Sequence, residues 1–80
     1  MSVRVLFFAH LQDVTGCREA ALDLAEGATV EAAAVWLCEH YPGLDLPGAA
    51  RAAVNAEFAD LHTVLHSGDE LAWMPPMSGG

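Results

Sequence analysis

The sequence has no lysine: its three basic residues are Arg4, Arg18 and Arg51, set against eleven acidic residues, and the formal net charge is −8. The phosphate backbone of a nucleic acid would repel so acidic a surface, so the composition predicts no nucleic-acid partner. A basic protein, or a basic enzyme cleft that attracts the chain, is the expected kind of partner. If the chain's terminus is an acyl donor, no lysine side chain of its own can accept the group.

Long apolar runs and cysteine clusters are also missing. No stretch approaches the roughly 20 apolar residues that span a membrane, and Arg4 interrupts the apolar N-terminal segment where a signal peptide would need an unbroken core. Cys17 and Cys38 are too few for a disulfide framework, and such thiols are usually reduced and structural. His62 and His66 are four residues apart, but the segment reads as a turn, so we interpret them as solvated. We expect a cytoplasmic protein with no membrane contact and no metal site.

The apolar pattern near the N-terminus predicts two strands. Residues 3–9 (VRVLFFA) are rich in β-branched and aromatic side chains, with Val3, Val5 and Phe7 on one face and Leu6 and Phe8 on the other. Turn-forming residues at 13–16 predict a loop, and residues 18–24 alternate as a second strand. The two runs predict an antiparallel hairpin.

A helix and three further strands follow in the pattern. Thr29 stands as an N-cap, and apolar residues at 30, 33, 34, 37 and 41 form one helical stripe that ends at Pro42-Gly43. Strands are predicted at 51–55, briefly at 58–59, and at 70–74, where Pro75 ends the ladder. The 80 residues therefore predict one α+β domain of the β-grasp (ubiquitin-like) class, a mixed sheet of about four to five strands crossed by one main helix.

The C-terminal letters WMPPMSGG predict a chemical handle. Residues 1–76 would form the domain and residues 77–80 a flexible tail that reaches about 13 Å when extended. Pro75-Pro76 stiffens the base of this tail, and Gly79 and Gly80 lack the Cβ that would keep another protein's backbone away. This shape suits insertion of a carboxylate into a narrow active site, where adenylation would make it reactive toward a sulfur nucleophile.

Four stretches carry a resemblance to a known family: VRVLFFAHLQDVTG, EGATVEAAAVWLCEHYPGL, AVNAEF and GDELAWMPPMSGG. In this order they resemble the small subunits of molybdopterin synthase, which are ubiquitin-like sulfur carriers. The GDE…PP-x-SGG ending is the specific part of the resemblance. The absence of lysine, and Met74 where an aromatic residue is frequent, are departures that do not touch the chemistry.

The resemblance implies a role for each terminal residue. Gly80 would carry a glycyl adenylate and then a thiocarboxylate, whose sulfur would enter the dithiolene of molybdopterin. The chain would be the non-catalytic sulfur donor of a sulfurtransferase. Contacts to a partner would come from the rest of the tail and from the apolar residues before it: Gly79, Ser78, Met77, Pro76, Pro75, Met74 and Trp73, with Phe7 or Phe8 from the first strand.

The resemblance also implies partners. A large catalytic subunit would bind the chain, in a heterotetramer, and an adenylyltransferase similar to ubiquitin-activating enzymes would charge Gly80. A sulfur donor protein would supply the sulfur. ATP and magnesium would be used by the activating enzyme, and this chain would bind no cofactor.

Three alternatives stay open on the sequence. The carrier could serve another client, such as thiazole, cysteine or tRNA thiolation. It could be a ubiquitin-like protein modifier, or a non-catalytic β-grasp interaction module in which the two glycines are incidental. Nor does the pattern assign the apolar residues Phe7, Phe8, Trp73 and Met74 to core or interface; we expect about half in each.

Overall fold

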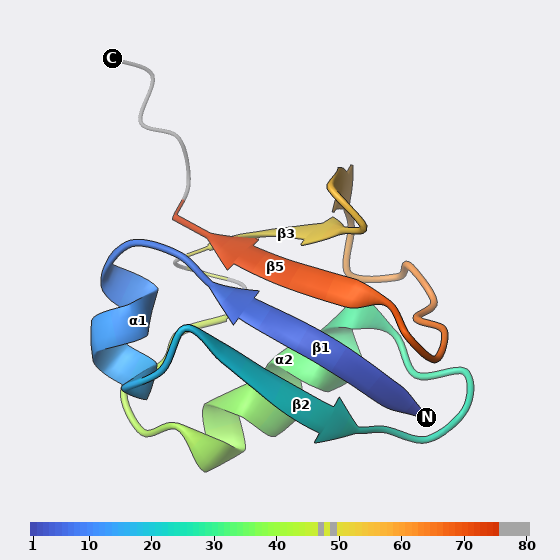
Figure 1. The fold of residues 1–80 in the computed structure, drawn as a ribbon, viewed down its shortest axis with the longest axis horizontal. Coiled ribbons are helices and arrows are strands. Elements are labelled where there is room, and N and C mark those ends of the chain that lie inside the picture. The colour runs from blue at the N-terminus through green and yellow to red at the C-terminus, as the bar shows by residue number, and fades with distance from the viewer. Residues whose placement is uncertain (47, 49, 76–80) are drawn as a thin grey trace.

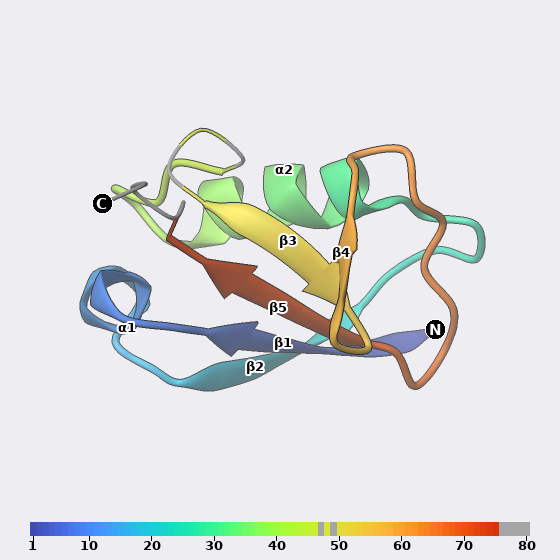
Figure 2. The ribbon, with the colours of Figure 1, turned by 90° about the horizontal axis from the view of Figure 1, so that it is seen from above.

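The computed structural model describes residues 1–46, 48 and 50–75, and within them one five-stranded mixed sheet is crossed by a helix on one face (Figure 1). Figure 2 shows helix α2 lying along that face. This arrangement confirms the α+β, β-grasp prediction. The elements in chain order are β1 (Ser2–Phe7), α1 (His10–Thr15), β2 (Glu19–Asp23), α2 (Val30–His40), β3 (Arg51–Val54), β4 (Glu57–Ala59) and β5 (Glu70–Met74).

The sheet has the strand order β2-β1-β5-β3-β4. The central pair, β1 and β5, is parallel, and the other pairs are antiparallel, including the predicted hairpin of β1 and β2. Because β1 and β5 run together, they end at the same edge of the sheet, with Phe7 opposite Trp73. At that same edge the antiparallel neighbours β2 and β3 begin. Side chains from the ends of two strands and the starts of two others therefore gather in one place.

Helix α2 forms as its sequence predicts. The Thr29 side chain caps it by accepting a hydrogen bond from the Ala32 backbone N–H at 3.3 Å. Its buried stripe faces the sheet, whereas Tyr41 lies at the C-cap, half-buried, with its ring edge-on to Phe7 at 5.8 Å between centroids. The buried helical residues are Val30, Ala33, Ala34 and Leu37.

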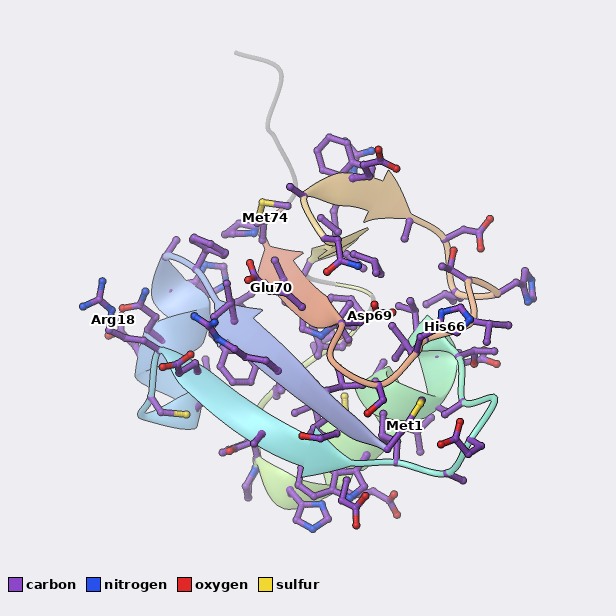
Figure 3. All side chains as sticks on the ribbon, turned by 45° about the vertical axis from the view of Figure 1, so that its right-hand side comes forward. Met1, Arg18, His66, Asp69, Glu70 and Met74 are labelled. Atoms are coloured by element: carbon purple, nitrogen blue, oxygen red, sulfur yellow. The ribbon has the colours of Figure 1, made fainter. Side chains whose placement is uncertain are left out.

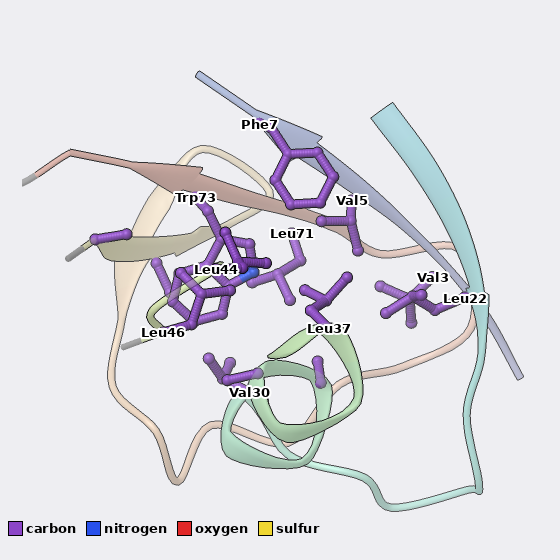
Figure 4. Close-up of a cluster of buried hydrophobic side chains, with 14 of the residues drawn as sticks. Val3, Val5, Phe7, Leu22, Val30, Leu37, Leu44, Leu46, Leu71 and Trp73 are labelled. Carbon is purple, nitrogen blue, oxygen red and sulfur yellow. The ribbon is translucent and has the colours of Figure 1, made fainter. Parts of the chain in front are cut away.

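The core fills the space between α2 and the sheet (Figure 4). Alternate residues of β1 point into it, as predicted, and β5 contributes Leu71 and Trp73. Each fully buried large apolar side chain contributes roughly 1.5–3 kcal/mol relative to exposure. The side chains under 2% exposed, in order of size, are Trp73, Phe7, Leu11, Leu22, Leu37, Leu65, Leu71, Val3, Val5 and Val30.

The prediction of a loop at residues 13–16 is wrong for most of that range, because α1 occupies His10–Thr15. This one-and-a-half-turn helix has no side-chain N-cap and only one buried residue, Leu11. Its stability comes from tertiary contacts: Gln12 Nε2 donates to the Phe7 carbonyl at 3.1 Å. A helix this short is marginal by propensity alone, which is why the sequence pattern does not reveal it.

The β3–β4 connection is a tight turn at Asn55 and Ala56, both with positive φ (50° and 72°). Such a turn suits a two-residue hairpin. It returns the chain so that Phe58 of β4 lies opposite Ala53 of β3, on the face away from α2. Within the described residues, no helix has the length and apolar character needed to cross a bilayer.

Candidate functional site

The predicted reactive segment follows β5. This strand is hydrogen-bonded on both sides, to β1 and to β3, and Met74 is its last residue. Pro75 directly follows it, and whatever leaves β5 therefore starts from a fixed point in the middle of the sheet. Five predicted site residues lie outside the described part of the chain: Pro76, Met77, Ser78, Gly79 and Gly80.

The four apolar residues predicted to contact a partner separate into two pairs. Phe7 is 1% exposed and Trp73 is 0% exposed, and both point to the helix side of the sheet (Figure 4). They are core residues, so their predicted contact with a partner does not fit this structure. Phe8 is 42% exposed and Met74 is half-buried at the end of β5 (Figure 3). The open face of the sheet therefore keeps only Phe8 and Met74 of the predicted four.

An apolar groove of about 330 Å³ lies on this open face. Aromatic rings from two separate strands border it, Phe8 beyond the end of β1 and Phe58 on β4. Glu70, at the start of β5, is the charged residue of its lining. A groove with apolar walls beside the end of β5 can take up a partner's side chains next to the reactive segment. The groove is lined by Phe8, Ala53, Ala56, Phe58, Glu70, Ala72 and Met74.

Phe58 is the groove residue that the sequence does not single out. Its side chain is 63% exposed, the largest exposure among the large apolar side chains of the described chain. The Arg51 guanidinium carbon lies 4.2 Å from the centre of its ring. In the sequence Phe58 belongs to a strand of only three residues, which is too short for an alternation pattern to assign its face. Only the pairing with Ala53 places it on the open face.

Asp69 and Glu70, where the chain enters β5, form an internal clasp of hydrogen bonds with Asn55. The Asp69 carboxylate accepts hydrogen bonds from Asn55 Nδ2 at 3.0 Å and from the His66 backbone N–H at 2.8 Å. These bonds favour the charged form, so the pKa of Asp69 lies below its ordinary value, with the Asn55 bond the larger cause. Asn55 also accepts from the Glu70 backbone N–H at 3.0 Å. The Asp69 carboxylate thus serves the fold.

The two cysteines are free and half-buried. Cys17 Sγ lies 3.9 Å from the Tyr41 hydroxyl, and the pKa of Tyr41 is raised, first by burial and then by its hydrogen bond with Cys17. His62 and His66 are both exposed. Within residues 1–46, 48 and 50–75, no three His, Cys, Asp or Glu side chains gather closely enough to hold a metal ion.

Similar sequences cover almost the whole chain. The profile of the ThiS family matches residues 5–80. A molybdopterin synthase sulfur carrier subunit of Chlamydomonas reinhardtii is 34% identical over 83 residues, covering 100% of both chains. The human protein of the same name is 34% identical, covering 98% of this chain and 93% of its own.

Solved structures agree with this similarity. SAMP1 from Haloferax volcanii superposes with a TM-score of 0.86 at 34% identity, covering 100% of both chains. A chain of the complex of subunits 1 and 2 of the molybdopterin-converting factor from Helicobacter pylori superposes with a TM-score of 0.72 at 26% identity, again over 100% of both chains. With a family profile that spans residues 5–80 and relatives matched over their whole length, the chain belongs to the ThiS family.

Proposed function

We propose that this chain is the sulfur carrier subunit of a molybdopterin synthase. The observation that supports it most is the match to carrier subunits of that name over their full length, within a family profile that extends to Gly80. The reactive group is the carboxylate of Gly80. The domain, residues 1–76, holds the last residues, 77–80, as a tail.

The chemistry follows from the weakness of a carboxylate as an electrophile. Attack of a Gly80 carboxylate oxygen on the α-phosphorus of ATP forms an acyl–adenylate bond and releases pyrophosphate. A sulfur nucleophile then attacks the acyl carbon, the C–O bond to AMP breaks, and AMP leaves. When this nucleophile is the outer sulfur of a donor's persulfide, the product is an acyl disulfide between the donor and Gly80. A thiol reductant then cleaves its S–S bond, which leaves the thiocarboxylate on Gly80 and the donor sulfur in a mixed disulfide with the reductant. A dithiolene has two sulfurs, so two charged chains are consumed per molybdopterin.

The tail residues have roles that suit their chemistry. Gly79 and Ser78 are small enough to pass through a narrow channel to another protein's active site. Pro75 and Pro76 restrict the backbone next to β5. Met77 offers a partner a second apolar side chain in addition to Met74, which borders the groove.

The proposal assigns partners outside this chain. A large subunit binds the open face and takes the sulfur; the Helicobacter pylori complex of subunits 1 and 2 supports a partner of this kind. An adenylyltransferase uses ATP and magnesium to charge Gly80, and a sulfur donor protein supplies the sulfur. The reaction belongs to the cytoplasm, where the free thiols of Cys17 and Cys38 are stable.

The test is tandem mass spectrometry of the C-terminal fragment after co-expression with an adenylyltransferase and a sulfur source. Sulfur on Gly80 is expected, confirmed by thiol-selective alkylation at that residue, because oxidation of a methionine or tryptophan adds nearly the same mass. A chain with one alanine appended after Gly80 is the matched control; it keeps the domain but should lose both charging and molybdopterin formation. Normal molybdopterin production by the extended chain would contradict the proposal.

A second candidate is a protein modifier, favoured by the similarity to SAMP1, a small archaeal modifier protein. It shares the adenylation step but ends in an amide bond between Gly80 and an amine of another protein. The same co-expression distinguishes the two. Isopeptide-linked peptides ending in Gly79-Gly80 would favour the modifier, whereas Gly80 thiocarboxylate with restored molybdopterin synthesis favours the carrier.

A further inference from the structure

Each of the three arginines of this acidic chain shares a hollow with Phe8 or stacks on Phe58, the two aromatic rings that border the apolar groove. Arg4 and Arg18 border a hollow of about 320 Å³ that also contains Leu6 and Phe8. Arg51 stacks on Phe58 on the other side of the apolar groove. The exposed face of α2, on the other side of the sheet, carries the acidic residues Glu31 and Glu39 instead. A strongly negative molecule therefore has its three arginines around one apolar surface, which also carries the acidic residues Glu19 and Glu70.

Two of these arginines flank the ends of the central strands, Arg18 next to β1 and Arg51 next to β5. Arg18 precedes β2, and its carbonyl accepts a hydrogen bond from the Phe7 N–H at 2.9 Å, while Arg51 begins β3 opposite Met74. Arg18 and Arg51 lie at the same end of the sheet because β2 and β3 start where β1 and β5 end. Phe8 and Met74 therefore lie between two arginines at the point where the tail departs. Figure 3 shows Arg18 projecting outward from the segment before β2.

Arg18 and Arg51 differ from Arg4 in their charge partners, although Arg51 stacks on Phe58. Arg4 forms an ion pair with Glu19 at 2.7 Å, which neutralises it. Among residues 1–46, 48 and 50–75, no carboxylate lies within ion-pair distance of Arg18 or Arg51. Both side chains are exposed. The acid that borders the groove, Glu70, is at the opposite end of β5.

We propose that the partner docked on this face presents an apolar insert flanked by carboxylates that pair with Arg18 and Arg51. The inference rests on the proposed function and names the chemistry of its large-subunit contact. It differs from what the net charge predicts: a basic partner suits the surface as a whole, but the face that carries the tail requires an acidic one. Paired charges around an apolar centre orient the partner, so that the tail enters in one direction.

The test measures binding to the large subunit of molybdopterin synthase from the same organism, with the full chain and its Arg18→Gln, Arg51→Gln and double variants. Each single change is expected to raise Kd about threefold to tenfold, and the double change more, at about 0.05 M salt. At about 0.5 M salt the differences should shrink. Arg18→Lys, which keeps the charge, should bind within about twofold of the parent chain.

Ala32→Glu on the exposed side of α2 is the matched control, since it also lowers the net charge by one. It should leave Kd unchanged, and thermal unfolding should show that all variants are folded. An equal loss of affinity in Ala32→Glu would mean that the net charge of the chain controls binding, and would overturn the proposal. Unchanged binding of the double variant would also overturn it. So would a finding that the arginine substitutions abolish self-association of this chain, because the face would then bind a second copy.

Thiocarboxylate formation on Gly80 is measured separately. A chain that carries sulfur but binds independently of Arg18 and Arg51 refutes only this inference, whereas one that neither carries sulfur nor binds refutes the proposed function as well.

Discussion

On the helix-covered face of the sheet, Phe7 and Trp73 are 1% and 0% exposed, whereas their direct chain neighbours Phe8 and Met74 stay accessible on the other face. The same two strands thus supply the core with one residue and the groove with the next. Burial on one face requires close packing, because an interior is as dense as an organic crystal. The open face has no such requirement in the isolated chain, so its apolar residues are available to a partner. Substitutions on the two faces should therefore separate stability from binding.

The largest expected effect is on stability. Trp73→Ala removes a fully buried side chain and should lower the free energy of unfolding by about 3–5 kcal/mol, because it leaves a cavity between the sheet and α2. Met74→Ala, one residue later on the open face, should cost about 1 kcal/mol or less. Chemical denaturation of the two variants measures both values.

Binding should show the opposite order. Met74→Ala is expected to weaken binding of the large subunit by at least tenfold, as for a central apolar contact. A Met74→Ala variant as unstable as Trp73→Ala would break the distinction between the faces. So would a Met74→Ala variant that binds like the parent chain.

A smaller effect is expected at the turn that places Phe58 on the open face. Ala56 has φ 72°, a conformation that costs a residue with a Cβ about 1–2 kcal/mol. Ala56→Gly removes that cost, while the greater conformational entropy of glycine in the unfolded chain offsets part of the gain. The free energy of unfolding should therefore rise by about 0.5–1 kcal/mol. The reverse change, Gly68→Ala at φ 89°, is the control and should destabilise; a Cβ there would meet no atom within 4 Å, so only the backbone conformation opposes it.

The smallest expected effect is the pH dependence from the clasp at the start of β5. The folded pKa of Asp69 is lowered, chiefly by the hydrogen bond from Asn55, so the ionised carboxylate stabilises the fold. This contribution is present above the unfolded pKa of an aspartate and is lost as the pH falls through the lower, folded pKa. Asp69→Asn should be less stable than the parent near neutral pH, and the difference should shrink as the pH falls below the ordinary pKa of an aspartate. Denaturation curves across this range measure it; a constant difference would show that the charge of Asp69 does not matter.

The sequence was informative where patterns are long or chemically specific. Helix α2 is marked in the sequence by an apolar stripe at five positions, the last of them the C-cap, and by an N-cap at Thr29. Strand β5 ends at Met74, directly before a proline. Helix α1 was missed because six residues with one buried side chain carry almost no periodicity. Of the groove residues, the sequence predicts Phe8 and Met74 as contacts for a partner but not Phe58, since a three-residue strand does not reveal its face.

The sequence by itself determined the β-grasp order of elements, the buried parity of β1, and the Ser78-Gly79-Gly80 ending that suits a carrier. These are local properties, fixed by side-chain alternation, capping and the missing Cβ of glycine. Tertiary structure decided which residue is buried in each of the neighbouring pairs Phe7–Phe8 and Trp73–Met74, because the register of β1 with β5 places Phe7 opposite Trp73. It also decided where the arginines lie: composition fixed the net charge at −8, but strand direction placed Arg18 beside the end of β1 and Arg51 beside the end of β5. Distances between residues far apart in the chain depend on strand pairing, and no single segment specifies that.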